Sequence, residues 1–417
     1  MDREVLVYVD LQGTPYLVGH LWARVRKDRE NATFEYDKSW LEHRERFSLE
    51  PALKLGPGPF HTPSDKPLFD AIGDSAPDRW GRVLMRRAER RRAEREGRTP
   101  RTVREIDYLL LVDDEARQGA LRFAADGGPF LADQGTVKIP PLIELPRLLA
   151  AAEHVAADKD NDEDLKLLLA PGSSLGGARP KASVRDRDGH LAIAKFPNKG
   201  DEVNTVVWEA LALTLAQRAG IAVPQWRLES VADKPVLLLR RFDREGNARI
   251  PFLSAMSMLD ARDNEARSYL EFVDALRQHG AAPKQVMATL WRRIVFSDLI
   301  SNTDDHLRNH GFLWTGSAGW QMSPAYDLNP VPVDIKPRVL TTAITLDDGT
   351  ASLKLAYEVA AYFELTAKDA RALAREVGDA VSGWRKEAVK LGLSKAEIDR
   401  MASAFEHEDL TAAVSGK

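Results

Sequence analysis

The chain contains no cysteine among its 417 residues. It can therefore form no disulfide, hold no zinc ion through thiolates and use no thiol nucleophile. It also lacks any uninterrupted apolar run of about 18 residues, the length that a membrane-spanning helix needs. The first residues, MDREVLVYVDLQG, alternate charged and apolar side chains and lack the apolar core of a signal peptide. These absences predict a soluble, cytoplasmic protein that makes no membrane contact.

The chain also has no excess of basic over acidic residues. Lys and Arg number 59 against 63 Asp and Glu, a formal net charge of -4, so any DNA contact would have to be local. The densest basic stretch is the arginine run within residues 86–95, which Glu89 and Glu94 interrupt. Such alternation is typical of a solvated helix face with i,i+4 ion pairs. A partner-binding or DNA-facing surface is the alternative.

The order of predicted elements indicates an α+β fold. Residues 4–26 alternate apolar and polar side chains on either side of turn residues, which predicts two antiparallel strands at the start of a small sheet. Helices are predicted at 78–96, 145–157 and 206–220, strand pairs at 181–197 and 226–242, and a mainly helical region from Tyr269 onward. Because 417 residues exceed what one hydrophobic core usually serves, we expect more than one structural unit.

The segment from Ser173 to Lys181, SSLGGARPK, lies ahead of a predicted strand. Glycines such as Gly176 and Gly177 let backbone N–H groups approach phosphate oxygens, and a nearby Lys or Arg adds positive charge. The pattern matches neither GxxxxGK[ST] nor GxGxxG, so it supports neither a P-loop NTPase nor a Rossmann site. An ordinary turn is the alternative for an isolated Gly-Gly pair.

A lysine, Lys195, closes the apolar strand LAIAK, and Glu209 follows on the next predicted helix. Kinases use such a lysine to bind nucleotide phosphates and such a glutamate to hold the lysine in place. A strand lysine that simply points to solvent is the alternative if the pair does not form.

The most informative segment is NTDDHLRN, residues 302–309, followed eighteen residues later by Asp327 in SPAYDLNP. Phosphoryl transfer needs a carboxylate that orients the attacking hydroxyl and hard oxygen ligands for magnesium. Asp304, then Asn309, then Asp327 supply these groups in the order found in kinases. Asp304 and Asp305 could instead be cap or turn residues. For His306, a structural hydrogen-bonding role is favoured over metal ligation.

These segments together resemble the HipA family of toxin kinases over nearly the whole chain. The resemblance rests in the first part on GHLWARV, FEYDKSWL, AIGDSAPDRWGR and DDEARQGALRF, and in the second on SSLGGARPKA, AKFP, WEALALTLAQRAGI, RRFDR, NTDDHLRNHGF and AYDLNP. It implies an N-terminal, mainly antiparallel β domain (1–125), a kinase N-lobe (146–243) and a helical C-lobe (244–417).

The resemblance implies a serine/threonine protein kinase that uses ATP and Mg2+. Its implied catalytic residues are Asp304 and His306, and its implied metal ligands are Asn309 and Asp327. The implied cofactor-binding residues are Ser174, Gly176, Gly177, Ala178, Lys181, Lys195, Glu209, Arg240, Phe242 and Asn309, with Leu239 to Phe242 as the adenine hinge. The family's kinases phosphorylate a serine of their own phosphate loop, here Ser174 or Ser173.

The resemblance also implies a HipB-like DNA-binding antitoxin as partner and DNA contact only through that complex. It implies a protein substrate as well, which for some relatives is an aminoacyl-tRNA synthetase. Two other functions are weighed beside this one. A catalytically silent, kinase-like module would bind nucleotide or antitoxin only. A metal-dependent hydrolase built on Asp304, His306 and Asp327 is disfavoured because no second His-rich ligand set accompanies them.

Overall fold

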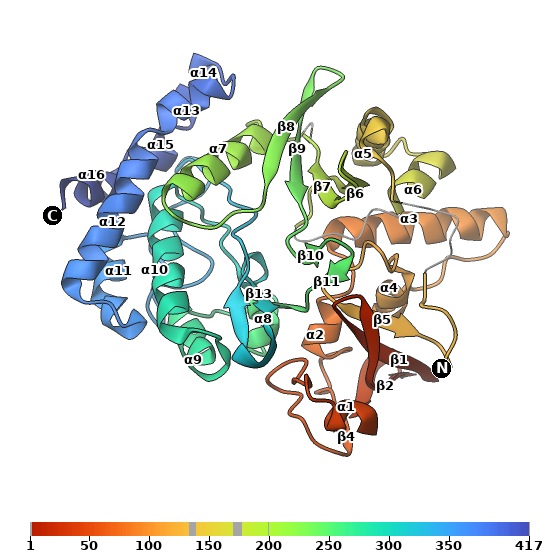
Figure 1. Cartoon of the computed structure of the whole chain (residues 1–417). Coiled ribbons are helices and arrows are strands. Elements are labelled where there is room, and N and C mark those ends of the chain that lie inside the picture. Colours follow the sequence, from red (N-terminus) through yellow and green to blue (C-terminus); the bar gives the residue numbers. More distant parts are fainter. Residues whose placement is uncertain (1, 133–138, 170–176, 199, 417) are drawn as a thin grey trace. The chain divides into compact units, whose positions relative to one another are not determined.

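The computed structural model describes residues 2–132, 139–169, 177–198 and 200–416 (Figure 1). It divides into two compact units, one formed by Met1–Gly200 with Glu229–Leu253, the other by Asp201–Leu228 with Ser254–Lys417. Among the described residues, no helix is both long and apolar enough to cross a membrane.

The first unit begins with an antiparallel sheet of strand order β4-β3-β2-β1-β5. The strands are β1 (Asp2–Leu11), β2 (Thr14–Arg26), β3 (Arg29–Tyr36), β4 (Pro59–His61) and β5 (Leu121–Ala124). The alternation in β1 buries Val5, Val7 and Val9 on one face, as a half-buried strand requires. The turn between β1 and β2 uses Gln12 and Gly13, both with positive φ, which suits a two-residue hairpin.

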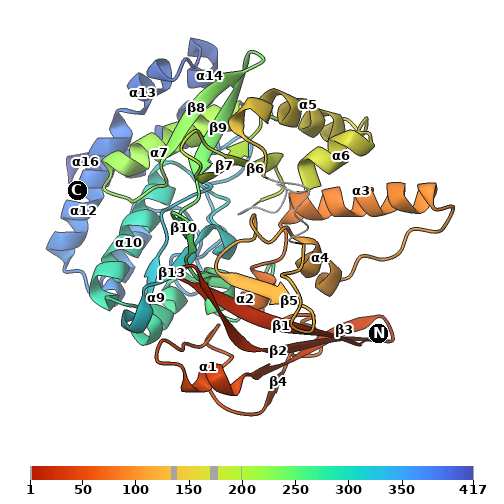
Figure 2. The same ribbon diagram turned by 45° about the vertical axis from the view of Figure 1, so that its right-hand side comes forward.

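Helices of the first unit are α1 (Lys38–Glu42), α2 (Asp70–Gly73), α3 (Arg79–Arg95), α4 (Glu105–Leu111), α5 (Leu145–Ala156) and α6 (Asp162–Leu169). The arginine run lies on α3, which runs beside α6 in both ribbon views (Figures 1 and 2). Arg87 pairs with Asp158 and Asp160, and Arg95 reaches Asp162 at 3.0 Å. Several of these arginines therefore connect α3 to the start of α6 and are already paired.

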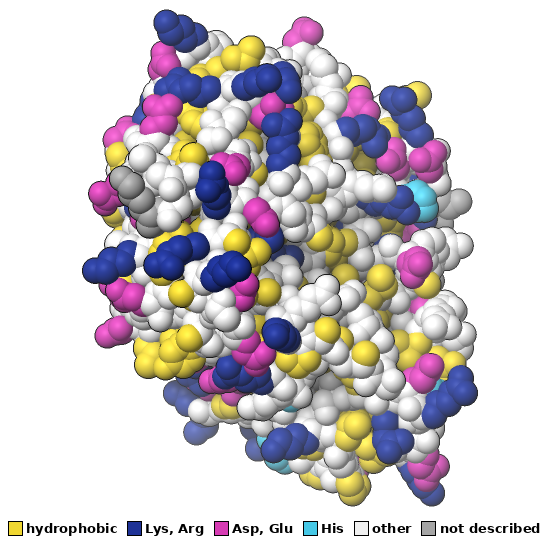
Figure 3. All heavy atoms as spheres, turned by 60° about the vertical axis from the view of Figure 1, so that its left-hand side comes forward, with side chains coloured by type: hydrophobic (Ala, Val, Ile, Leu, Met, Phe, Trp, Pro, Cys, Tyr) yellow, Lys and Arg dark blue, Asp and Glu magenta, His cyan; other side chains and the backbone are white. Residues whose placement is uncertain are grey.

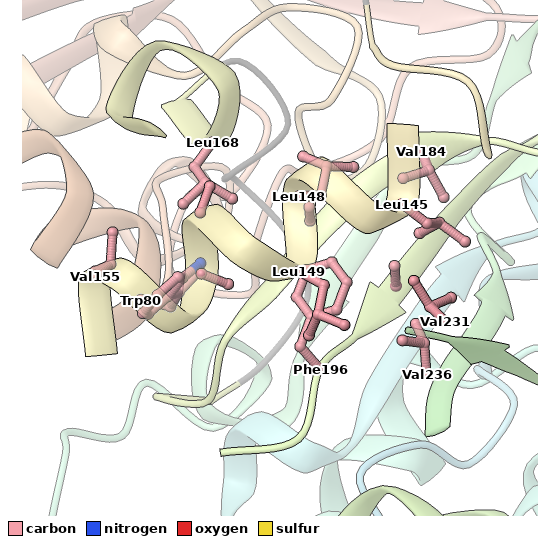
Figure 4. Packing of buried hydrophobic residues seen from close by; sticks show 14 of the residues in the cluster. Trp80, Leu145, Leu148, Leu149, Val155, Leu168, Val184, Phe196, Val231 and Val236 are labelled. Atoms are coloured by element: carbon pink, nitrogen blue, oxygen red, sulfur yellow. The ribbon is translucent and has the colours of Figure 1, made fainter. Parts of the chain in front are cut away.

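A second sheet in this unit has the order β6-β7-β9-β8, with β6 (Lys181–Arg185), β7 (Leu191–Lys195), β8 (Trp226–Val231) and β9 (Lys234–Arg240). Its apolar side chains form one core with α5, α6 and the start of α3. Figure 4 shows Leu148 and Leu149 of α5 among these side chains. The hairpin of β10 (Arg244–Glu245) and β11 (Ala248–Arg249) follows, and then β12 (Phe252–Ser254).

The second unit is mainly helical. Its helices are α7 (Thr205–Arg218), α8 (Ala255–Met258), α9 (Tyr269–His279), α10 (Pro283–Leu299), α11 (Leu353–Val359), α12 (Ala367–Ser382), α13 (Trp384–Lys390), α14 (Lys395–Arg400), α15 (Ala402–Phe405) and α16 (Glu408–Ser415). One hairpin, β13 (Gly311–Trp314) with β14 (Trp320–Met322), interrupts them. In the core, Trp384 and Phe405 stack with ring centroids 4.4 Å apart, and Trp208 packs against both at a tilt. Antiparallel sheets followed by this helical region confirm the predicted α+β fold.

Charges of both signs share the surface. On the face shown in Figure 3, Lys and Arg side chains are interspersed with Asp and Glu. This distribution agrees with the near balance of the composition, 59 basic against 63 acidic residues.

Candidate active site

The loop 301–309 follows directly on the buried helix α10. Ser301, with φ 51, turns the chain out of the helix, and Leu307–Asn309 form a short 3-10 turn. Asp304 is exposed, whereas its neighbour Asp305 is buried. The Nδ2 group of Asn309 donates to the carbonyl of Asp304 at 2.9 Å and so closes the loop. The carboxylate of Asp304 is thus accessible on a loop whose backbone is fixed.

Asp305 anchors this loop to the helical unit. It is 3% exposed, accepts a hydrogen bond from the hydroxyl of Tyr269 and lies 2.8 Å from Nε2 of His310. Burial by itself would raise the pKa of Asp305, but His310, Tyr269 and Ser297 together hold that pKa below its ordinary value. Its carbonyl also accepts from Thr342 Oγ1 at 2.7 Å. Cap and turn roles were the alternatives from sequence, and neither anticipated this buried anchor.

Asp327 lies on a second loop that is tied to the first. Asp327 has a left-handed backbone with φ 57. Two residues further on, the N–H of Asn329 donates to Oδ1 of Asn302 at 3.0 Å. The hydroxyl of Tyr326 donates to the carbonyl of Arg308 at 2.9 Å. These cross-links bring the loop of Asp304 and Asn309 together with that of Asp327.

Sequence reasoning assigned no role to the residues that make these cross-links, Asn302, Tyr326 and Asn329. All three stand inside the segments NTDDHLRN and AYDLNP, so their place in the motifs was the available signal. The sequence did not show that the two loops pair with each other. Two hydrogen bonds establish this pairing, and the residues that they join are separated by 18 and by 27 positions in the sequence.

The donor set fits a magnesium ion. Because Nδ2 of Asn309 is used on Asp304, its Oδ1 is left as a candidate ligand atom, and this buried oxygen has no hydrogen-bond partner among the described residues. Asp327 adds one carboxylate. No group of three or more His, Cys, Asp or Glu that could hold a metal occurs in the described part of the chain. Magnesium is commonly held by one or two protein carboxylates together with substrate phosphates, so this sparse set suits it.

His306 shapes the loop through its backbone. Its N–H donates to the carbonyl of Asp304 at 2.9 Å, and its carbonyl accepts from the N–H of Asn309 at 2.8 Å. The side chain is half-buried, and its Nδ1 has no hydrogen-bond partner within the described ranges. These backbone contacts shape the loop beside Asp304, and a hydrogen-bonding role for the His306 ring stays a prediction.

The expected phosphate-binding lysines occupy the first unit. Lys195 at the end of β7 is directly opposite Lys181 at the start of β6, and both are buried. The ammonium of Lys181 donates to Asp78 Oδ2 at 2.7 Å and to the carbonyl of Gly177 at 3.1 Å. Burial raises the pKa of Asp78, and the cation of Lys181 acts against that rise. Lys181 is therefore held by the N-terminal part of the chain.

Other predicted residues are placed as follows. Gly177 has φ 86, a backbone that favours glycine, and Ala178 beside it is exposed. Ser173, Ser174 and Gly176 lie outside the described residues. Glu209 is buried on α7 in the second unit, so its pairing with Lys195 of the first unit stays a prediction.

The predicted hinge, Leu239 to Phe242, begins with the last two residues of β9. Arg240 contacts Nε2 of His190 at 3.1 Å, and the Phe242 ring lies 6.4 Å from that of Phe252. The N–H of Arg241 donates to the carbonyl of Leu191 at 2.9 Å, so this hinge amide continues the sheet.

Directly after the hinge in the chain, Asp243 is the centre of a buried charge cluster with Arg241 and Arg244. Sequence reasoning missed this cluster. Asp243 is fully buried, accepts from Arg241 Nε at 2.7 Å and from Arg244 at 2.9 Å, and also accepts from the N–H of Gly119 at 2.7 Å. Burial would raise the pKa of Asp243, but the two guanidinium groups hold it well below its ordinary value. The motif RRFDR was the only signal, and Gly119 lies 124 residues away.

Comparison with known proteins identifies the family. The model of the HipA-like C-terminal domain matches residues 173–384, and that of the HipA N-terminal domain matches residues 9–105. The chain belongs to the HipA family. The family resemblance found in the motifs is thereby confirmed.

HipA-family likeness extends to individual proteins. "Putative kinase Y4mE" of Sinorhizobium fredii is 25% identical over 353 residues, which are 74% of this chain and 75% of the relative. A "Putative kinase" of Haemophilus influenzae is 24% identical over 213 residues, 44% of this chain and 61% of that relative. Among solved structures, HipA from the Shewanella oneidensis HipA, HipB and operator DNA complex superposes with a TM-score of 0.69 and 16% identity, covering 99% of this chain and 96% of that one. This last match supports the HipA fold.

Proposed function

We propose that the protein is a serine/threonine protein kinase of the HipA type that transfers the γ-phosphoryl group of ATP to a protein serine. The observation that carries the proposal is the pair of tied loops in the second unit. One presents the exposed Asp304 next to Asn309, whose Oδ1 has no hydrogen-bond partner in the described part of the chain, and the other presents Asp327. Relatives named as kinases support the same activity.

In the proposed reaction, Asp304 accepts a hydrogen bond from the substrate hydroxyl, orients its oxygen toward the γ-phosphorus and receives its proton. A bond forms between that oxygen and phosphorus while the bond from phosphorus to the β,γ-bridging oxygen breaks, so ADP leaves. Asn309 and Asp327 would hold Mg2+, which offsets the negative charge of the phosphates when bound. Lys195 would meet the phosphates, held by Glu209, and the backbone of Leu239 to Phe242 would meet adenine.

Autophosphorylation and partners extend the proposal. Ser174, or Ser173 beside it, is the proposed autophosphorylation site, because a phosphate there adds about -1.5 to -2 charge next to the phosphate-binding loop and would repel ATP. A HipB-like antitoxin is the proposed partner, since the Shewanella oneidensis HipA is described in complex with HipB and operator DNA. An aminoacyl-tRNA synthetase is the proposed substrate class.

The test is incubation of purified protein with Mg2+ and ATP, followed by intact-mass and peptide mass spectrometry, with Asp304→Asn as control. One added phosphate on Ser174 or Ser173, absent from the control, supports kinase chemistry and the self-inhibiting loop together. ATP binding without any phosphate on the protein or on an added antitoxin or synthetase would instead favour the silent binding module.

A further inference from the structure

The side chain of Lys181 is held in the first unit by a carboxylate distant in sequence and by a carbonyl close to it in sequence. Its ammonium donates to Oδ2 of Asp78, which lies 103 residues earlier, and to the carbonyl of Gly177. The Lys181 side chain is 1% exposed and that of Asp78 is 8% exposed. One cation thus ties the end of the Gly-rich segment to a carboxylate of the N-terminal region.

Asp78 is itself rigidly placed. It is the N-cap of α3, and its side chain accepts from the N–H of Gly81 at 2.8 Å. Two residues on, the indole N–H of Trp80 donates to the carbonyl of Lys181 at 2.9 Å. Trp80 is packed into the core with Val155 and Leu168 nearby (Figure 4). Residues at the start of α3 therefore bind Lys181 through both its backbone carbonyl and its ammonium group.

The ion pair of Lys181 with Asp78 also affects Lys195 on the neighbouring strand β7. Lys181 and Lys195 are directly opposite each other in the β6–β7 register, so their side chains leave the same face of the sheet. Like charges in that position repel and weaken strand pairing. The carboxylate of Asp78 offsets one of the two positive charges, which allows both lysines to be buried side by side.

We infer that Asp78 and Lys181 form a brace that positions the end of the Gly-rich segment, and that Lys181 is a positioning residue instead of a phosphate ligand. Lys195 is then the lysine of this face that meets the nucleotide phosphates. This assignment revises the expectation from sequence that both lysines bind the cofactor. It rests on the proposed function, since it concerns how ATP is bound.

Three variants separate a brace from a ligand. Asp78→Asn keeps an N-cap and removes the charge, Lys181→Met removes the cation, and the double variant removes both. With MgATP affinity measured by titration calorimetry, a brace predicts that each single change weakens binding roughly tenfold and that the double variant is no weaker, because both changes break one contact. Autophosphorylation should recover at saturating ATP, so KM changes and kcat does not.

A direct ligand gives a different pattern. Lys181→Met would weaken ATP binding, while Asp78→Asn would leave it unchanged or strengthen it by releasing the ammonium. That pattern, or additive losses in the double variant, overturns the inference. The matched control is Glu105→Gln, which breaks the ion pair of Arg82 in the first turn of the same helix and should leave ATP affinity unchanged.

A measurement on the unmodified protein covers the case in which Asp78→Asn does not fold. Amine-reactive labelling with and without MgATP, read by peptide mass spectrometry, should find Lys181 slow to react in both conditions. A Lys181 that reacts readily alone and is protected by ATP contradicts the brace. If the unmodified protein binds no ATP, the proposed function fails; if it binds ATP and Asp78→Asn binds equally well, only the brace fails.

Discussion

Two groups of polar side chains, the cluster around Asp243 and the loop 301–309, differ in how completely they are paired among the described residues. Around Asp243, buried carboxylate oxygens accept from Arg241, Arg244 and the N–H of Gly119. In the loop 301–309, Asp304 is exposed and Oδ1 of Asn309 has no partner among the described residues. Removing one partner of a fully paired buried charge destabilises a fold, whereas groups with spare bonding capacity can bind a ligand or move a proton. The comparison separates structural from candidate catalytic residues within one chain.

The largest effect is expected at Asp304. Asp304→Asn keeps the size of the side chain but removes the group that accepts the proton, so autophosphorylation should fall by roughly 10²- to 10⁴-fold. ATP affinity should stay near that of the unmodified protein, because the change leaves Asn309 and Asp327 in place. Rates come from radiolabelled ATP and affinity from calorimetry. Equal activity in the variant would remove Asp304 from the mechanism.

Asp243→Asn tests the saturated cluster. Removing one partner of a buried ion pair leaves uncompensated charge, so the free energy of unfolding should fall by about 3–5 kcal/mol. Urea unfolding followed by fluorescence measures this loss. The exposed pair of Arg92 and Glu96 is the control, and Glu96→Gln should leave the unfolding midpoint almost unchanged. A midpoint shift no larger than that of the control would show that the cluster is not stabilising.

Glu50 is a buried carboxyl whose charge, unlike that of Asp243, is not offset by two guanidinium groups. It is 3% exposed and accepts from the N–H of Ala71, and burial raises its pKa to about 8. Because the folded protein then binds a proton that the unfolded chain releases near its ordinary pKa of 4.5, this contribution is complete below about pH 4.5 and is lost as the pH rises toward 8.

Glu50→Gln should remove that pH dependence. The variant should match the unmodified protein in stability near pH 4 and exceed it by roughly 4 kcal/mol at pH 8, about 1.4 kcal/mol for each unit by which the pKa is raised. Urea unfolding of both proteins across this range is the measurement. Parallel curves for the two proteins would mean that Glu50 is ionised throughout and that its burial has no such cost.

The smallest effect is expected at Tyr326. Tyr326→Phe removes the hydrogen bond to the carbonyl of Arg308, which is worth about 1 kcal/mol. The two loops should loosen, and autophosphorylation should fall several-fold with little change in the unfolding midpoint. Tyr16→Phe, at a half-buried position of β2, is the matched control. Unchanged activity at Tyr326→Phe would show that the other cross-link, Asn302 to Asn329, is sufficient.

Much of the fold was predictable because periodicity is local. The alternation of apolar and polar residues predicted β1 and β2, and the 3.6-residue spacing of apolar residues predicted α5 and α7. The spacing of Asp304, Asn309 and Asp327 predicted a kinase-type set of polar groups. Hydrogen bonds tie their two loops together, and the catalytic and metal-binding roles stay predictions. Burial within an irregular loop follows no period, so the opposite environments of Asp304 and Asp305 were not predictable.

Residue types, their order and the family were determined by the sequence itself, since motifs and periodicity are properties of short segments. Only the tertiary structure decided which charged side chains are paired within the fold. The pairs of Lys181 with Asp78 and of Asp243 with Gly119 join residues more than a hundred positions apart. Such partners meet only when packing brings distant elements together, because a hydrogen bond depends on distance in space and not on separation along the chain.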